Sequence, residues 1–447
     1  MKKIQLNILM VLTLFIVLLF LVGCNKSVDY SPKENYNIII IGWDGVQRDH
    51  FFECYHKQLS ECSEGLPNIK KLSEGNIFNL TITDGATNTK AGWVQILSGY
   101  NSEISGTYGN NKYQPLPQGY SLFEKIENTF GDQNVYSVFL GAKPNHVGAH
   151  CKGEQNVVYN YQGKLKDPGP EKYGEPWCIT QNQVDYFETG IGYNETNFLN
   201  HNKKVGEKAL DFLDIYIEQH SNETLIAFFH FGEPDGVGHK TIKGENSKDY
   251  SEAIIDDDEW LGKIVKKTKQ LGIYNQTLIY VVTDHGFDEM GISNGRNHFN
   301  APFGIFATND PLVIRSGDRK DITPTILKRL GVSQDKIGTV PAVNGFSLDS
   351  IPSFTCINES EAYISYSSAP SCCSGLKLIN LDKYMETEGC VKATGGKGDQ
   401  SGYCTRCGDG ICKLPEDGCN CPADCPLKTS NKVKEKIDFS DDVLTVN

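Results

Sequence analysis

A run of four isoleucines, Ile38 to Ile41, constrains the fold of this chain more than any other segment. Such a run predicts a strand that is buried on both faces, which is typical of parallel sheets. Gly42 and Gly45 bracket Asp44 directly after the run, so a carboxylate follows the carboxyl end of the strand. Open α/β sheets bind their ligands at that edge. Aspartate is also a common helix N-cap or turn residue, and Asp44 alone does not decide between the two roles.

The same arrangement of an apolar strand followed by acidic or imidazole groups recurs later in the chain. Residues 225–231 and 277–283 predict two more buried strands, and each is followed within eight residues by an aspartate and a histidine. A doubly wound sheet gathers its strand ends along one edge. We therefore expect six side chains to converge there: Asp44, Asp235, His239, Asp284, His285 and His298.

The chemistry of these six side chains points to a metal centre. Three aspartates and three histidines, with no cysteine among them, suit zinc, with manganese or iron as alternatives. The set is larger than one tetrahedral zinc needs, so two ions fit it better. The alternative is that each group only caps a helix or a turn, but strand-end clusters in this number are hard to assign to packing.

Residues 87–99 predict a helix that begins with small polar residues and ends at Gly99. Its first turn contains two threonines, Thr87 and Thr89. A hydroxyl at a helix N-terminus lies beside free backbone amides in the positive end of the helix dipole, a suitable place for a nucleophile that attacks phosphorus. A threonine there can also be a simple N-cap.

The formal charge of the chain limits the partners that it can bind. The net charge is −13, and lysine and arginine form no long cluster. This balance argues against a nucleic-acid polymer as partner, because such a polymer requires a basic surface. A small phosphate ester remains compatible, provided that a metal site supplies the local positive charge.

The N-terminus predicts export rather than part of the fold. Lys2 and Lys3 precede an apolar run over residues 8–22, and Leu21-Val22-Gly23-Cys24 resembles the lipobox of bacterial-type lipoproteins. We expect residues 1–24 to be a signal peptide with lipidation at Cys24. The alternative is an uncleaved signal anchor. Both readings place the protein outside the cytosol on a membrane surface.

The cysteines divide the remainder of the chain. Without Cys24 their number is fourteen, which suits disulfides outside the cell, and ten of them lie between Cys356 and Cys425. A zinc ribbon is the alternative for that region, where Asp409 and Asp424 are either calcium ligands or solvated loop residues. The expected organisation is a linker at 25–36, a catalytic domain at 37–352, a cysteine-rich domain at 353–427 and a disordered tail at 428–447.

Taken together, the motifs resemble the alkaline phosphatase superfamily, and most closely its nucleotide pyrophosphatase/phosphodiesterase branch. The resemblance covers about residues 37–352. It rests on Ile-Ile-Ile-Gly-Trp-Asp-Gly-Val, the stretch 89–99, Glu-Pro-Asp-Gly-Val-Gly-His, Thr-Asp-His-Gly, Asn-His-Phe and the segments 321–327 and 344–348. It implies an α/β fold, a three-layer α/β/α sandwich that carries two zinc ions, here followed by a small disulfide-rich module.

The resemblance also implies a role for each site residue. Thr89 rather than Thr87 is the nucleophile, and a phosphothreonine intermediate forms on it and is hydrolysed. The implied ligands are Asp44, Asp284, His285 and the Thr89 oxygen for one zinc, and Asp235, His239 and His298 for the other. The expected activity is cleavage of phosphodiester or pyrophosphate bonds by an exported phosphohydrolase. Alternatives are a phosphomonoesterase, a phosphonate hydrolase, a phosphotransferase or a non-catalytic cell-surface binding module.

One departure from the family concerns the residues after the nucleophile. The family usually has Phe-Pro-Asn there, and its asparagine holds a phosphate oxygen, whereas this chain has Lys90-Ala91-Gly92. Lys90 either supplies the missing contact to the phosphate or points to solvent. The preference between diesters and monoesters stays open for the same reason.

Overall fold

The computed structural model describes most of the chain between residues 36 and 425. The expected signal peptide with Cys24 and the expected tail at 428–447 lie outside the described residues. Within the described range the gaps are 83–85, 111–112, 114–115, 144–148, 151–177, 180–183, 193–200, 288–294, 299–300, 302, 335, 338–339, 351–355, 358, 360–361, 365–371, 381–383, 387–389, 393–400, 413–415 and 417.

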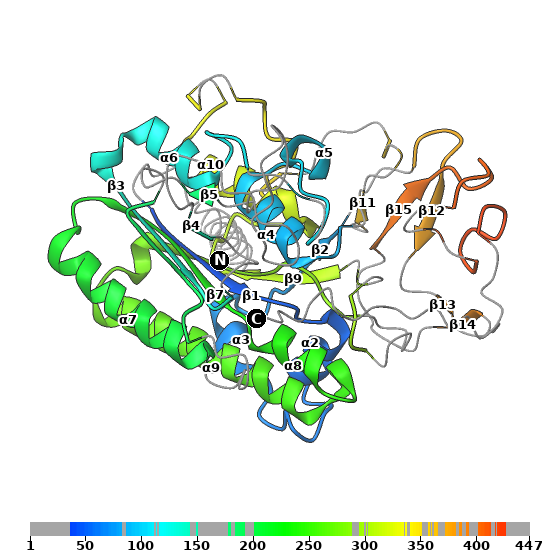
Figure 1. Ribbon diagram of the computed structural model, residues 1–447, viewed down its shortest axis with the longest axis horizontal. Helices are drawn as coiled ribbons and strands as arrows, with labels where there is room; N and C mark the ends of the chain where they lie inside the picture. The colour runs from blue at the N-terminus through cyan, green and yellow to red at the C-terminus, as the bar shows by residue number, and fades with distance from the viewer. Residues whose placement is uncertain are drawn as a thin grey trace, which may run out of the picture.

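The described strands include an eight-stranded sheet in the order β10-β2-β9-β8-β1-β7-β3-β6 (Figure 1). The isoleucine run lies in β1 (Asn37–Trp43), which is parallel to both of its neighbours, β7 (Thr224–Phe231) and β8 (Thr277–Thr283). The other strands of this sheet are β2 (Phe78–Thr81), β3 (Val135–Gly141), β6 (Tyr186–Thr189), β9 (Phe303–Thr308) and β10 (Gly317–Asp318).

The sheet is mixed rather than wholly parallel. β9 runs antiparallel to β8 on one side and to β2 on the other. The expectation of a doubly wound sheet therefore holds for its centre, β3, β7, β1 and β8, and not for this edge. An antiparallel neighbour can follow without a crossover helix, so no buried-strand pattern in the sequence predicts its direction.

Helices cover both faces of the sheet and make the predicted three-layer α/β/α sandwich (Figure 1). Alternate residues of β1 enter opposite cores: Ile39 and Ile41 face one, and Ile38 and Ile40 face the other. Each isoleucine is fully buried, which stabilises the fold by about 1.5–3 kcal/mol per side chain.

The two helical layers differ in the helices that they contain. The layer on the Ile39 face holds α2 (Arg48–Tyr55), α3 (Pro67–Leu72), α7 (His201–Gln219), α8 (Glu233–Lys240) and α9 (Lys248–Gln270). The layer on the Ile38 face holds α4 (Thr89–Ser98), α6 (Leu122–Phe130) and α10 (Ile322–Arg329), with the short α5 (Ser102–Ser105) after α4. Single 3-10 turns are η1 (Asp132–Asn134), η2 (Gly244–Asn246), η3 (Tyr274–Gln276) and η4 (Arg319–Asp321).

The C-terminal region forms small sheets. An antiparallel three-stranded sheet has the order β11-β15-β12, and β13 pairs with β14. The bounds are β11 (Ala362–Ile364), β12 (Lys377–Asn380), β13 (Tyr384–Glu386), β14 (Cys390–Lys392) and β15 (Ser401–Thr405). A further short pair, β4 (Ala149–His150) with β5 (Cys178–Ile179), lies earlier in the chain.

Disulfides join the C-terminal cysteines, as the sequence predicts, and this excludes a zinc ribbon built from the same sulfur atoms. The bonds are Cys356–Cys373, Cys372–Cys404, Cys407–Cys421 and Cys412–Cys425, and Cys54–Cys62 joins two residues near α2. Disulfides are typical of proteins that leave the reducing cytosol.

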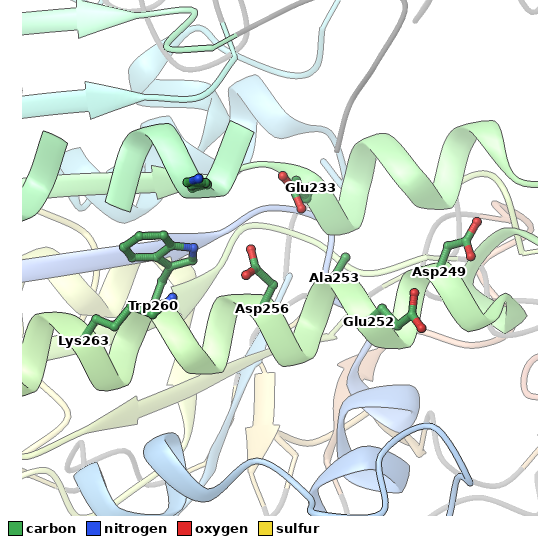
Figure 2. A pocket seen from close by; sticks show the side chains of 8 residues that line it. Glu233, Asp249, Glu252, Ala253, Asp256, Trp260 and Lys263 are labelled. Carbon is green, nitrogen blue, oxygen red and sulfur yellow. The ribbon is translucent and has the colours of Figure 1, made fainter. Parts of the chain in front are cut away.

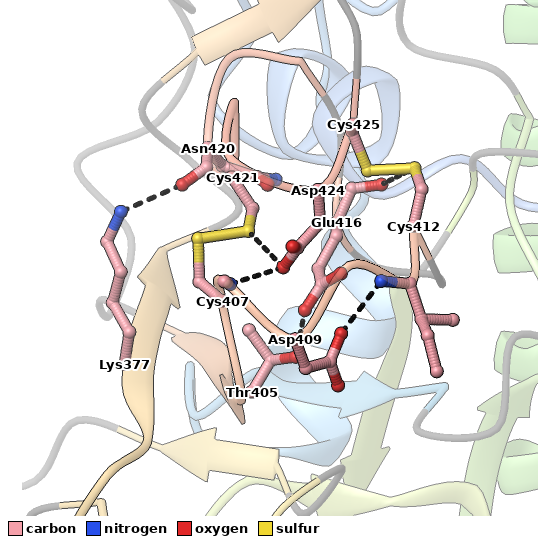
Figure 3. Close-up of a disulfide and its surroundings, with 12 residues drawn as sticks. Lys377, Thr405, Cys407, Asp409, Cys412, Glu416, Asn420, Cys421, Asp424 and Cys425 are labelled. Atoms are coloured by element: carbon pink, nitrogen blue, oxygen red, sulfur yellow. Dashed lines mark hydrogen bonds between the residues drawn. A yellow bond between two sulfur atoms is a disulfide. The ribbon is translucent and has the colours of Figure 1, made fainter.

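The two aspartates that were candidates for calcium in this region accept hydrogen bonds from backbone amides (Figure 3). The Asp424 carboxylate accepts hydrogen bonds from the amides of Gly408 and Gly410, and Asp409 accepts one from the Ile411 amide. These bonds fix the loop between the cysteines, which favours a structural role for both carboxylates.

Among the residues that the structure describes, no helix has the length and apolar character needed to cross a membrane.

Candidate metal centre

The ends of the central strands bring the predicted site residues together in the interior of the protein. Asp44 follows β1, Asp235 lies in the first turn of α8 after β7, and Asp284 follows β8. Gly45 permits their close approach, because it has a φ of +68° and a Cβ there would lie 2.7 Å from the Cβ of Asp235. The backbone joins the strand ends as well: the Asp235 amide donates to the Asp44 carbonyl at 3.1 Å.

Asp235, His239 and His298 form one group that could hold an ion, with ligand atoms within 4.8 Å of one another. Asp235 and His239 are four residues apart in α8 and therefore lie on one face of it. His239 Nδ1 lies 2.7 Å from the carbonyl oxygen of Arg296. A carbonyl can only accept, so Nδ1 carries the proton, and Nε2, 3.3 Å from Asp235 Oδ1, keeps its lone pair for a metal.

Asp44, Asp235 and His285 form a second such group. His285 Nδ1 donates to the carbonyl oxygen of Gly286 at 3.0 Å, which again leaves Nε2 to face the carboxylates, at 3.7 Å from Asp44 and 3.8 Å from Asp235. Asp284 lies beside this group: its Oδ2 is 3.3 Å from His285 Nε2, and its Oδ1 accepts from the Gly45 amide at 3.1 Å. Asp235 is thus common to both groups, whereas the resemblance assigns it to one ion only.

Unpartnered oxygens show that these residues fit a metal. Within the described part of the chain, Asp235 Oδ1 and Asp284 Oδ2 are buried and accept no hydrogen bond. Buried carboxylate oxygens without a donor are costly, and a divalent ion would satisfy both. Asp and His donors suit zinc, manganese or iron.

Burial is the main cause of the pKa shifts of Asp284 and His285 in the centre. Burial and the neighbouring Asp44 raise the pKa of Asp284 well above its ordinary value. Burial lowers the pKa of His285 and so favours the neutral imidazole that binds metals. A bound cation would stabilise the ionised form of Asp284.

Thr89 lies against this centre at the N-terminus of α4. Its Oγ1 is 3.0 Å from His285 Nε2, whose lone pair accepts the hydroxyl hydrogen. The helix can come so close because Gly92 has no side chain: a Cβ there would lie 2.6 Å from the Cβ of Asp284. The departure from the family at Gly92 therefore has a packing reason in this chain.

Arg319 holds α4 against the end of β8. This fully buried guanidinium donates from Nη1 to the Asp284 carbonyl at 2.5 Å and from Nη2 to the Ala86 carbonyl at 2.8 Å and to Gln95 Oε1 at 2.9 Å. It thereby connects the segment before Thr89, the helix that carries Thr89 and the strand end that carries Asp284.

Lys90 does not point to solvent, which excludes one of its two expected placements. The residue is 6 % exposed, and its Nζ lies 3.7 Å from the ring centre of Tyr113. Its backbone amide donates to Asn110 Oδ1 at 3.1 Å.

Two residues of the centre, Lys143 and His230, were not among the site residues predicted from the sequence. Lys143 Nζ donates to Asp44 Oδ1 at 2.9 Å and also to Asp235 Oδ2. His230 Nε2 donates to Asp44 Oδ2 at 2.7 Å from inside β7. Burial alone would raise the pKa of Asp44, but Lys143 and His230 outweigh it and hold that pKa below its ordinary value. Lys143 follows the end of β3 by two residues, so the strand-end rule that singled out Asp44 could have found it.

A hollow of about 380 Å³ lies between α7, α8 and α9 (Figure 2). Carboxylates dominate its lining, and in Figure 2 those of Glu233 and Asp256 lie across from one another, with Trp260 to one side. A phosphate anion would be repelled by such a lining, so this hollow is not where the phosphate of a substrate would bind.

A family model described as type I phosphodiesterase / nucleotide pyrophosphatase matches residues 38–304, more than half of the 447-residue chain. The chain belongs to this family. The family expected from the motifs is thereby confirmed.

Individual relatives of this family member match shorter segments. The chain is 27% identical over 186 residues to the bis(5'-adenosyl)-triphosphatase ENPP4 of Pongo abelii, a match that covers 38% of this chain and 41% of that protein. It is 30% identical over 132 residues to a 2,3-bisphosphoglycerate-independent phosphoglycerate mutase of Wolbachia pipientis wMel, covering 28% of this chain and 25% of the mutase. The chain thus spans less than half of the length of these curated relatives.

Solved structures also align with this family member at low identity. The lipoteichoic acid synthase LtaP of Listeria monocytogenes gives a TM-score of 0.47 at 13% identity, over 83% of this chain and 88% of the synthase. A 2-O GAG sulfatase gives a TM-score of 0.44 at 13% identity, over 77% of this chain and 80% of that one.

Proposed function

We propose that this protein is a two-zinc phosphohydrolase that cleaves phosphodiester or pyrophosphate bonds with Thr89 as nucleophile. The observation that carries the proposal is the 3.0 Å contact between Thr89 Oγ1 and His285 Nε2, at a helix N-terminus beside two groups of metal-binding side chains. Membership of the phosphodiesterase/pyrophosphatase family supports the same activity.

The proposed ligands follow the family pattern. One ion would be held by Asp44, Asp284 and His285 with the Thr89 oxygen, and the other by Asp235, His239 and His298. Bound divalent ions would act as Lewis acids on a phosphoryl group and neutralise the charge that develops on it. The unpartnered oxygens of Asp235 and Asp284 support this assignment.

The chain itself orients the nucleophile. Thr89 Oγ1 lies 3.0 Å from His285 Nε2, so an ion held by His285 would also be within reach of the Thr89 oxygen. In the proposed first step the Thr89 Oγ–P bond forms while the bond from phosphorus to the leaving-group oxygen breaks, and the Thr89 hydroxyl proton ends on that leaving-group oxygen. Water then attacks the phosphothreonine and releases phosphate product and the Thr89 hydroxyl. The positive end of the α4 dipole stabilises the added negative charge in both steps.

Further proposals concern substrate contact and location. Lys90 is a candidate contact for the substrate phosphate because it is buried next to Thr89. We also propose that Cys24 is lipidated and anchors an exported protein to a membrane surface. The disulfides support export.

Hydrolysis of three model substrates tests the function. Purified protein with zinc would be given bis-p-nitrophenyl phosphate, p-nitrophenyl phosphate and p-nitrophenyl sulfate, beside the Thr89→Ala and Asp284→Ala variants. We expect diester turnover that falls by at least about 10³-fold in both variants. Thr129→Ala is a matched control, because Thr129 bonds only within α6, to the Lys125 carbonyl. Zinc-loaded protein that is inert toward all three substrates would favour a non-catalytic binding module.

A phosphotransferase is the second candidate. The observation in its favour is a similarity, 22% identity over 286 residues, to the GPI ethanolamine phosphate transferase 1 of Candida glabrata, which covers 62% of this chain and 27% of that protein. Both activities begin with the same threonine intermediate. Added glycerol or ethanolamine distinguishes them: a transferase forms the phosphorylated alcohol in preference to inorganic phosphate, and a hydrolase does not.

A further inference from the structure

Lys143 places a positive charge where the two candidate ion groups meet. Its Nζ donates to Asp44 Oδ1 at 2.9 Å and to Asp235 Oδ2. Asp44 belongs to one group and Asp235 to both, so a single ammonium contacts the shared part of the centre. The residue is 7 % exposed, and no other lysine of the described chain has an ion pair with either carboxylate.

The stem of Lys143 is held so that the ammonium faces the centre. Lys143 lies two residues after β3, whose last residues pair with the end of β7. Its Cγ packs at the start of α8, 3.5 Å from where a Cβ of Gly232 would be. The side chain therefore reaches the carboxylates over a packed surface and not through solvent.

We propose that Lys143 is the cation of the substrate's phosphate pocket: its ammonium binds a phosphoryl oxygen when ions occupy the centre and rests on Asp44 and Asp235 when they do not. This inference rests on the proposed function. An ammonium and a divalent ion compete for the negative charge of the same two carboxylates, so ion binding releases the ammonium. A phosphate that enters the same edge is then its nearest available anion, and a charged hydrogen bond to it is strong.

Lys90 is the other lysine that could contact the substrate phosphate, and its surroundings differ from those of Lys143. Lys90 follows the nucleophile, but its Nζ lies 3.7 Å from the centre of the Tyr113 ring, a cation–π contact that already uses its charge. No ion pair of Lys90 with a carboxylate of the centre is found among the described residues, whereas Lys143 has two. Of the two lysines, we assign the dominant phosphate contact to Lys143.

Equilibrium binding of inorganic phosphate to zinc-loaded protein tests this assignment directly. Calorimetry would compare wild type with Lys143→Met, Lys143→Arg and Lys90→Met, with the zinc content of each sample measured by mass spectrometry. We expect phosphate to bind about 10–100-fold more weakly to Lys143→Met, with partial recovery in Lys143→Arg and a smaller loss in Lys90→Met. Lys125→Met is the control for losing a buried lysine, since Lys125 contacts the Ser98 and Tyr120 carbonyls and not the centre.

A second readout needs no substrate. In ion-free protein, Lys143→Met should lower the thermal midpoint, because Asp44 and Asp235 lose the cation that they share. The same variant should bind zinc more tightly than wild type, because no ammonium has to be displaced.

The two readouts separate failure of this inference from failure of the proposed function. Zinc-loaded Lys143→Met that binds phosphate as tightly as wild type overturns the inference, as does a larger loss in Lys90→Met. Wild-type protein that takes up no ion and binds no phosphate overturns the proposed function, and the inference with it.

Discussion

Single side chains in this protein are held in place by other side chains that do not bind an ion themselves. Asp44 accepts hydrogen bonds from His230 at 2.7 Å and from Trp93 at 3.4 Å. Both donors are buried, so the carboxylate has one orientation. Such support orients metal ligands and raises their affinity for the ion.

Replacing His230 should therefore weaken ion binding. In His230→Leu, Asp44 Oδ2 loses its shortest donor, and we expect zinc affinity to fall about 10–100-fold. Competition against a chromogenic chelator measures this. His220→Leu is the control: His220 follows α7 and pairs with Glu223 at the surface, and its loss should leave zinc affinity unchanged. Equal affinities for His230→Leu and wild type would contradict the orienting role.

Among the helices, α4 and α6 show how the layer on the Ile38 face is fixed. Arg319 ties α4 to the end of β8, and α6 begins with a capping box in which Ser121 and Glu124 bond each other's backbone amides. Near the end of α6, Glu127 Oε1 accepts a hydrogen bond from Ser137 Oγ in β3 at 2.8 Å. A carboxyl group thus lies between a helix and the sheet.

Glu127 makes the stability of the protein depend on pH. Burial, aided by the nearby Asp185, raises the pKa of Glu127 from 4.5 to about 7. The folded protein therefore keeps this proton to a higher pH than the unfolded chain, and the free energy of unfolding falls as pH rises from 4.5 to about 7. Because the group is partly exposed, we expect a change of about 1 kcal/mol.

Urea unfolding at pH 5 and pH 8 measures this dependence. Glu127→Gln should be less sensitive to pH than wild type and more stable than wild type at pH 8. Glu64→Gln is the control, because Glu64 is exposed. If the free energy of unfolding changed between pH 5 and pH 8 by the same amount in wild type and in Glu127→Gln, the role of this carboxyl would be contradicted.

At the scale of the whole molecule, two kinds of stabilisation coexist. The central sheet is stabilised by large apolar cores on both faces. The C-terminal sheets have few buried apolar side chains among the described residues, chiefly Ile357 and Ile379, and rely on disulfides. Regions with so small a core fold only with covalent links.

Mild reduction should therefore unfold the C-terminal region before the central sheet. Each of its disulfides contains a cysteine that is not fully buried, whereas Cys54 and Cys62 are both buried. After reduction, amide hydrogen exchange should rise in β11, β12 and β15 and stay slow in β1. Diester hydrolysis in the same sample should persist. Simultaneous loss of protection in β1 and β15 would show that both parts unfold as one unit.

The sequence by itself determined the central strands, the three layers and the family. A run such as Ile38 to Ile41 can only be buried on both faces, and the helix predicted to end at Gly99 forms as α4 and ends there. The strand-end rule then singled out the acidic and imidazole residues that lie together in the structure, because parallel strands align their carboxyl ends whatever their order.

Only the tertiary structure decided how those residues are shared and supported. Lys143 lies 99 residues from Asp44 in the sequence and His230 lies 186, so the contacts depend on β3 and β7 being close to β1 in the sheet. Three further features also depend on the tertiary structure: the place of Asp235 in both ion groups, the antiparallel direction of β9, and the hydrogen bonds by which Arg319 joins α4 to the end of β8. A local pattern fixes which residues stand at a strand end, but the order of the strands fixes which of them touch.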